Sequence, residues 1–193
     1  MRCAEITRKT KETDITVRLD LDGAPGASVQ TGIGFFDHML TALAVHGGMK
    51  LEVSCKGDLE VDCHHTIEDV GIVIGQALNA ALGDKSGIRR YGSAYVPMDE
   101  ALAFAALDIS GRPYLVFHGE FKAPAVGGMD TQMVEEFFRA AAFHSGITLH
   151  LNVLYGENDH HKAEALFKAF AHALKSAAAK SGSDQPLSTK GVL

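Results

Sequence analysis

The chain has little cysteine and no long hydrophobic run, and each scarcity excludes a class of protein. Its three cysteines, Cys3, Cys55 and Cys63, are odd in number and lack Cys-x-x-Cys spacing. That pattern argues against a disulfide framework and against a thiolate zinc site. No apolar stretch approaches the roughly 20 residues that a membrane helix requires, and the charged N-terminal segment is unlike a signal peptide. We therefore expect a cytoplasmic protein with no membrane partner.

The chain also lacks an excess of positive charge. Lys and Arg together number 18 against 24 Asp and Glu, for a formal net charge of -6. Such a balance gives no overall attraction to nucleic acid, so we expect a small-molecule partner and any anion site as a local cluster. The length of 193 residues with 46% hydrophobic content is enough for one substantial core.

The first half of the chain reads as strands followed by two helices. Strand-like alternation over residues 4–22 and 27–32 is separated by Gly23, Pro25 and Gly26, which predict a hairpin turn. Apolar spacing predicts a helix over 35–48, a strand over 49–57 and a second helix over 64–82. Asp62 is placed to cap that second helix.

The same order returns in the second half, with strands predicted over 102–110, 113–121 and 147–154 and helices over 133–146 and 160–178. At one constant offset, the residues His64, His65, Glu68, Val70, Ile74 and Leu78 match His160, His161, Glu164, Leu166, Phe170 and Leu174. We infer an α+β fold with an internally duplicated unit, each half a β-sheet with two helices on one face. The half-repeats are expected at 1–91 and 92–193, together forming one compact domain.

The repeated motif is suited to metal binding. Residues four apart share a helix face, so His64 with Glu68, and His160 with Glu164, can each grip one ion. The adjacent histidines point about 100° away around the helix and would reach a second ion. Two such motifs favour a dinuclear site, with further candidate ligands at the matched positions His38 and Glu136. Imidazole and carboxylate donors suit Mn, Fe, Co, Ni or Zn, and affinity order does not choose among them.

Other polar residues carry weaker signals. His46 and His144 each sit at a helix end before a glycine, where a substrate role and a protonated imidazole that favours the helix dipole both stay open. Candidate anion-binding groups are Arg90, Arg112 and, in the tail segment PLSTKG, Lys190. The unmatched histidines are expected to be structural, and they are His118, His150 and His172.

The motifs GIGFFDHML, CKGDLEVDCHHTIEDVG, GIRRYG, DISGRPY and YGENDHHKAEALFKAF together make the chain resemble the imidazoleglycerol-phosphate dehydratases of histidine biosynthesis along nearly its full length. The resemblance implies a lyase that dehydrates imidazole glycerol phosphate to imidazole acetol phosphate. It also implies a dinuclear site with two Mn²⁺ that binds the substrate imidazole as imidazolate. The implied assembly is a 24-subunit homo-oligomer built from trimers, with active sites at subunit interfaces.

Site residues follow from the same resemblance, motif by motif. The implied metal ligands are His38, His64, His65, Glu68, Glu136, His160, His161 and Glu164. Many members of the family have histidine where this chain has Glu136, so a carboxylate stands in place of an imidazole. The implied substrate contacts are Glu12, His46, Arg90, Arg112, Ser188 and Lys190, with the basic groups on the phosphate. Glu12, Glu68 and Glu164 are the acids expected in catalysis, and Glu12 is the candidate general base.

Two other functions use the same ligands. A dinuclear metallohydrolase acting on a phosphorylated substrate would use them to make a bridging hydroxide. A metal-storage or assembly protein would use the clamps to join subunits without turnover.

Overall fold

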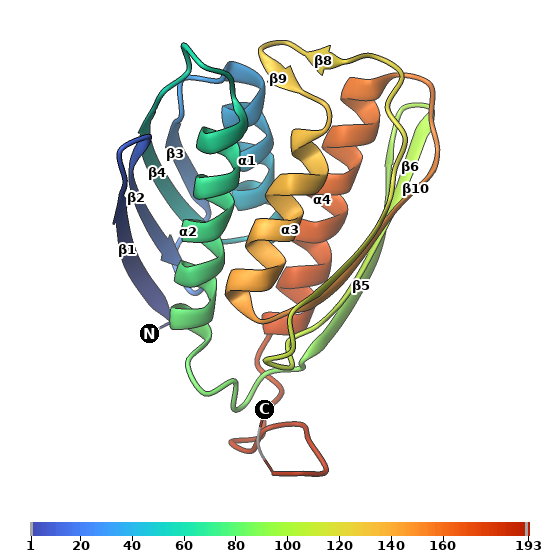
Figure 1. Cartoon of the computed structure of the whole chain (residues 1–193). Helices are drawn as coiled ribbons and strands as arrows, with labels where there is room; N and C mark the ends of the chain where they lie inside the picture. Colours follow the sequence, from blue (N-terminus) through green and yellow to red (C-terminus); the bar gives the residue numbers. More distant parts are fainter. Residues whose placement is uncertain (1, 192) are drawn as a thin grey trace.

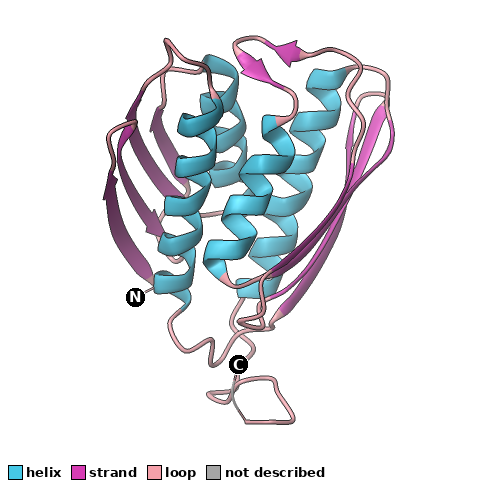
Figure 2. Cartoon of the chain, in the orientation of Figure 1, coloured by secondary structure: helices cyan, strands magenta, loops and turns pink. Residues whose placement is uncertain are grey.

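Two four-stranded sheets enclose four helices, as Figures 1 and 2 show. The computed structural model describes residues 2–191 and 193. In Figure 1 the first sheet lies on the left, the second on the right, and the helices stand between them. Among the described residues, no helix combines the length and the apolar character needed to cross a bilayer.

The first half forms one sheet and two helices. Its elements are β1 (Cys3–Lys9), β2 (Thr13–Asp20), β3 (Gly26–Gln30), α1 (Gly34–Gly47), β4 (Lys50–Gly57) and α2 (His64–Leu82). The strand order is β1-β2-β4-β3. The hairpin predicted at Gly23, Pro25 and Gly26 is therefore wrong, because β4 lies between β2 and β3 and pairs with β3 in parallel. The hairpin of this sheet instead joins β1 to β2, where the Thr10 amide donates to the Thr13 carbonyl over 2.8 Å.

The second half repeats this plan. Its elements are β5 (Tyr91–Met98), β6 (Ala101–Asp108), β7 (Tyr114–His118), β8 (Ala125–Val126), β9 (Met129–Asp130), α3 (Met133–Ser145), β10 (Thr148–Tyr155) and α4 (Asp159–Ala178). The order β5-β6-β10-β7 matches the first sheet position by position. The sequence pattern does not predict β5 or the small β8–β9 pair. The duplicated α+β architecture is confirmed, with α1 and α2 on the first sheet and α3 and α4 on the second.

The core lies where the inward faces of the sheets meet the helices. Along β2 the burial alternates residue by residue, as expected for a strand with one wet face. Between the helices, five phenylalanine rings pack with centroids 4.7 to 5.5 Å apart: Phe36, Phe137, Phe138, Phe167 and Phe170. Rings at such spacing bury large apolar areas and favour edge or offset contacts. The aromatic cluster fixes the helices of the two halves against each other.

Helices of opposite halves pack in parallel pairs, α2 with α3 and α1 with α4. Glycines bring α2 close to α3: a Cβ built on Gly71 would lie 2.9 Å from the Phe137 carbonyl oxygen, and one on Gly75 would lie 2.7 Å from that of Ala141. The later residue of α2, Gly75, contacts the later residue of α3, Ala141, so α2 and α3 run in the same direction. Their N-termini, which carry the candidate ligands, therefore lie at one end of the molecule (Figure 1).

Replacement of Gly75 by alanine should destabilise the fold by about 1–3 kcal/mol, because the added methyl group overpacks the α2–α3 contact against backbone. Gly34→Ala is the matched control, since nothing lies within 4 Å of the added Cβ; its stability should stay within about 1 kcal/mol of the parent. Denaturant unfolding of the metal-free proteins measures both. A Gly75→Ala variant as stable as the parent would contradict close glycine-mediated packing.

Candidate metal centre and substrate site

The start of α4 gathers three potential ligands from the two halves. Asn158 caps the helix, and its side chain accepts hydrogen bonds from the His160 and His161 amides. His160 Nε2 lies 3.1 Å from Glu164 Oε2, and His38 Nε2 of α1 lies 3.3 Å from the same oxygen. One ligand atom of each residue lies within 4.8 Å of the others, and this is the one such group of three in 2–191 and 193.

Glu164 is held as a carboxylate although it is buried. Burial alone would raise its pKa, but hydrogen bonds with Lys168 and His160, together with the Lys168 charge, lower the pKa to about 2. Lys168 Nζ lies 2.6 Å from Glu164 Oε1, which leaves Oε2 facing the two histidines. A buried anion beside two imidazole nitrogens is a fitting place for a divalent cation.

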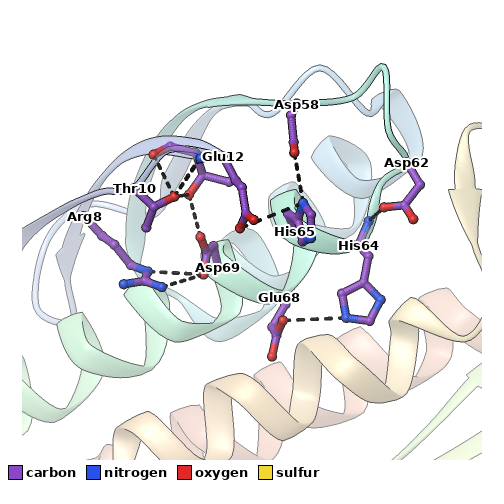
Figure 3. Close-up of polar contacts among 10 residues, drawn as sticks. Arg8, Thr10, Glu12, Asp58, Asp62, His64, His65, Glu68 and Asp69 are labelled. Carbon is purple, nitrogen blue, oxygen red and sulfur yellow. Dashed lines mark hydrogen bonds and ion pairs between the residues drawn. The ribbon is translucent and has the colours of Figure 1, made fainter.

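The start of α2 carries the corresponding pair in the first half (Figure 3). His64 Nε2 lies 3.6 Å from Glu68 Oε2. Asp62 Oδ1 accepts a hydrogen bond from the His64 amide over 2.7 Å, although the N-cap position itself is Cys63, one residue later than predicted. As with Asn158 in the second half, a side chain before the helix fixes the first histidine.

Glu136 of α3 sits in register with this pair. Gly71 of α2 contacts Ala140 of α3. Glu68 lies about one turn before Gly71, and Glu136 lies one turn before Ala140, so the two acids lie at the same level of the helix pair. Its carboxylate pairs with Arg139 over 3.6 Å and is partly exposed. The register gives Glu136 the same relation to α2 that His38 has to α4. Imidazole and carboxylate donors of this kind fit Mn²⁺ and other divalent ions.

Each of the divergent histidines is fixed by a carboxylate that sequence reasoning missed. Asp58 Oδ2 lies 3.0 Å from His65 Nδ1, and Glu100 Oε2 lies 2.7 Å from His161 Nδ1. These hydrogen bonds raise the pKa of both imidazoles. A bond at Nδ1 leaves Nε2 of each ring for another partner, and Nε2 of His161 lies 3.6 Å from Asp99 Oδ2. The sequence signal was weak, because Asp58 lies in the loop seven residues before His65, outside any helical spacing, and Glu100 lies 61 residues before His161.

Glu12, the candidate base, lies at the turn between β1 and β2 with an exposed side chain. Its Oε2 is 4.0 Å from His65 Nδ1, beyond a hydrogen bond, and Figure 3 shows it beside the His65 ring. The fold thus brings Glu12 next to the α2 motif, which lies more than fifty residues away in sequence.

The two candidate phosphate arginines converge on Asp108. Arg90 donates from Nε to Asp108 Oδ1 over 2.7 Å and from a terminal nitrogen to Oδ2 over 3.1 Å, while Arg112 reaches Oδ2 over 3.3 Å. Arg90 is buried and has a φ of 74°, an uncommon conformation for a residue other than glycine. Asp108 was not singled out in the sequence, where it lies inside the strand predicted over 102–110; in the structure it is the last residue of β6.

The C-terminal tail reaches the same cluster. Arg90 donates to the Leu187 carbonyl over 2.6 Å, one residue before Ser188, and the Lys190 amide donates to the Ser188 hydroxyl over 3.2 Å. The cluster is remote from the metal ligands, because the Arg90 amide bonds to the Ala177 carbonyl near the far end of α4. At 1.5 Å per residue that point is about 25 Å along the helix from His160. One chain does not bring the two groups together.

His46 lies in the last turn of α1, with its ring 5.4 Å from that of His172 on α4. Burial, followed by the charges of Lys168 and His172, lowers its pKa. A lowered pKa disfavours the protonated helix-dipole role that the sequence left open. The neutral ring can accept or donate a hydrogen bond beside the α1–α4 contact.

Comparisons with known proteins show which family this chain is similar to. The family model described as imidazoleglycerol-phosphate dehydratase matches residues 31–174. The chain is 58% identical to the imidazoleglycerol-phosphate dehydratase of Acetivibrio thermocellus, covering 98% of this chain and 97% of the relative. It is also 58% identical to that of Ruminiclostridium cellulolyticum, over 100% of both chains.

Solved structures with these names share the fold. The Staphylococcus aureus enzyme is 41% identical, with a TM-score of 0.84 over 93% of this chain and 99% of that one. The Pyrococcus furiosus enzyme is 38% identical, with a TM-score of 0.85 over 97% and 100%.

Glu100 should make the stability of the metal-free protein depend on pH. Hydrogen bonds from the Asn158 amide and from His161 lower its pKa from 4.5 to about 2. Because the pKa of Glu100 is lower in the folded state, its ionised carboxylate stabilises the fold above pH 4.5. That contribution is lost as the pH falls toward 2. Glu100→Gln should therefore be less stable at neutral pH and lose less stability on acidification. Urea unfolding at a series of pH values tests this, and parallel pH profiles for variant and parent would contradict it.

Proposed function

Because this chain belongs to the imidazoleglycerol-phosphate dehydratase family, whose members are hydro-lyases of histidine biosynthesis, we propose that it dehydrates imidazole glycerol phosphate at a dinuclear Mn²⁺ site. The observation that carries the proposal is the convergence of His38, His160 and Glu164 from opposite halves of the chain. The product is imidazole acetol phosphate.

The ligands divide into two groups related by the repeat. His38, His160 and Glu164 would hold one ion, and Glu136, His64 and Glu68 would contribute to the other. His65 and His161 point away from these groups and offer Nε2 to ions shared with another copy of the chain. Bound metal would supply a Lewis acid that stabilises negative charge on the substrate imidazole.

Proton transfer is assigned to Glu12. Loss of water removes the hydroxyl on the carbon next to the imidazole ring and a proton from the following carbon, and the resulting enol becomes the ketone. Glu12 is exposed, makes no side-chain hydrogen bond within the described residues and lies beside His65. A carboxylate so placed can take that carbon proton. His46, whose pKa is lowered and whose ring lies beside His172 where α1 packs on α4, is assigned to hydrogen bonding of a substrate hydroxyl.

The phosphate is assigned to Arg90 and Arg112, with Ser188 and Lys190 from the tail. Since these groups lie about 25 Å along α4 from the metal ligands, a complete site requires two copies of the chain. Exposed Tyr91, Tyr95 and Tyr114 on the second sheet offer apolar surface for such contacts. We propose a homo-oligomer of 24 subunits built from trimers. The free thiols Cys3, Cys55 and Cys63 fit a cytoplasmic setting.

Turnover distinguishes this proposal from the two alternatives. The Mn²⁺-loaded protein should convert imidazole glycerol phosphate to the ketone, whereas the chelated protein should not. Phosphate release without ketone would instead indicate a metallohydrolase. Disassembly on chelation with no turnover under any condition would indicate a metal that only joins subunits. Product identification by mass spectrometry, with sedimentation before and after chelation, makes these distinctions.

Single substitutions separate ligands from base. Glu68→Ala and Glu164→Ala should each lower bound Mn²⁺ and activity together, because each removes a carboxylate from a helical clamp. Glu12→Gln should keep its full metal content and lose at least about 100-fold in kcat, the usual contribution of a general base. Metal analysis beside steady-state kinetics provides the readout. Metal-replete, active Glu68 and Glu164 variants would refute the ligand assignment, and unchanged catalysis in Glu12→Gln would place the base elsewhere.

A further inference from the structure

In each half of the chain a carboxylate holds the divergent histidine, His65 or His161, but the two halves use carboxylates from different positions of the repeat. Glu12 and Glu100 occupy equivalent places, each directly before the second strand of its sheet, at Thr13 and Ala101. Glu100 bonds to the Nδ1 of its histidine over 2.7 Å, whereas Glu12 lies 4.0 Å from the Nδ1 of His65. Equivalent acids therefore have different partners.

A second pair of equivalent acids divides the roles the other way: the acid of the first half bonds to its histidine, and the acid of the second half does not. Asp58 and Glu157 each directly follow a glycine at the end of the strand that precedes the ligand helix: Gly57 is the last residue of β4, and Gly156 comes directly after β10. Both glycines occupy corresponding contacts, since a Cβ on Gly57 would meet the Thr66 side chain and one on Gly156 would meet that of Lys162. Asp58 bonds to His65 Nδ1 over 3.0 Å, whereas Glu157 pairs at the surface with Lys122.

In each half, one of the two acids therefore hydrogen-bonds to the divergent histidine and the other does not. In the second half Glu100 is fully engaged, because its Oε1 also accepts the amides of Glu157 and Asn158 over 3.0 and 2.7 Å. In the first half the loop before α2 runs from Asp58 to Cys63 and is longer than the loop over 156–158 before α4. That longer loop delivers Asp58 to His65, and Figure 3 shows Asp58 and Glu12 approaching the ring from different sides.

We propose that Asp58 is a positioning residue that holds His65 by Nδ1 and so leaves Glu12 free for proton transfer. The inference rests on the function proposed above. Glu100 performs the holding role for His161 and has no oxygen left for chemistry. The two halves therefore differ in the acid that lies directly before the second strand. Glu12 of the first half can act as the base, whereas Glu100 of the second half holds His161.

The test measures Mn²⁺ affinity of the full-length metal-free protein by titration calorimetry, a readout that does not require turnover. Asp58→Ala should weaken Mn²⁺ binding by about 10–100-fold, the usual effect of removing the partner of a metal-binding histidine. Asp58→Asn should recover most of that affinity, because its amide oxygen can still accept the Nδ1 proton. Glu157→Ala is the matched control and should bind Mn²⁺ as the parent does.

The relation between Asp58 and Glu12 is tested by a double substitution. With Asp58 removed, Glu12 should take over only part of its role at Nδ1, so Mn²⁺ affinity still falls. The kcat of Asp58→Ala should also fall while KM changes little. Glu12→Gln alone should leave Mn²⁺ affinity unchanged, but Glu12→Gln added to Asp58→Ala should lower it further. Such non-additivity is the signature of one group replacing another at a shared partner.

Three results would overturn the inference: parental Mn²⁺ affinity in Asp58→Ala, an equal loss in Glu157→Ala, or additive effects of the Asp58 and Glu12 substitutions. Circular dichroism identifies any variant that fails to fold, in which case Asp58→Asn and the Glu157 control carry the comparison. If the parent protein binds Mn²⁺ but forms no ketone, the dehydratase proposal fails while the affinity series still tests the positioning of His65.

Discussion

The close packing of helices from opposite halves is the contact on which the site depends. Gly71 and Gly75 let α2 approach the backbone of α3, and the phenylalanine cluster joins α1 and α3 to α4. Because the paired helices run in the same direction, their first turns meet at one end of the molecule. Potential ligands that belong to different repeats, such as His38 and Glu164, become neighbours only through this packing.

The electrostatic arrangement around these helix starts follows from how each group is partnered. Glu164 remains a carboxylate in a buried position because Lys168 lies against it. The divergent histidines are oriented by Asp58 and Glu100 from loops that precede or face the helix. Carboxylates at Nδ1 select the nitrogen that each ring presents, which is a common way to prepare imidazole for a cation.

Arg90, which is proposed to bind the phosphate, lies at the far end of α4 from the proposed metal ligands. Its strained backbone, its two bonds to Asp108 and its bond to the Leu187 carbonyl fix a basic group far from the helix starts. Strain of this kind is retained where the surrounding structure over-determines it, and it gathers at functional positions. Under the proposed function, a substrate with an imidazole at one end and a phosphate at the other would contact two copies of the chain.

The sequence by itself determined the repeat, the two helices that carry the His-His-x-x-Glu motif and the pairing of His64 with Glu68 and of His160 with Glu164, because residues four apart on a helix are neighbours whatever the rest of the chain does. The first residue of α2, His64, was predicted in place, and so was the duplicated α+β class. The hairpin at Gly23, Pro25 and Gly26 was wrong, since local turn residues do not reveal that β4 inserts between β2 and β3. Only the tertiary structure decided which acid serves which histidine, because Asp58, Glu12 and Glu100 reach their rings through loops whose paths depend on long-range packing.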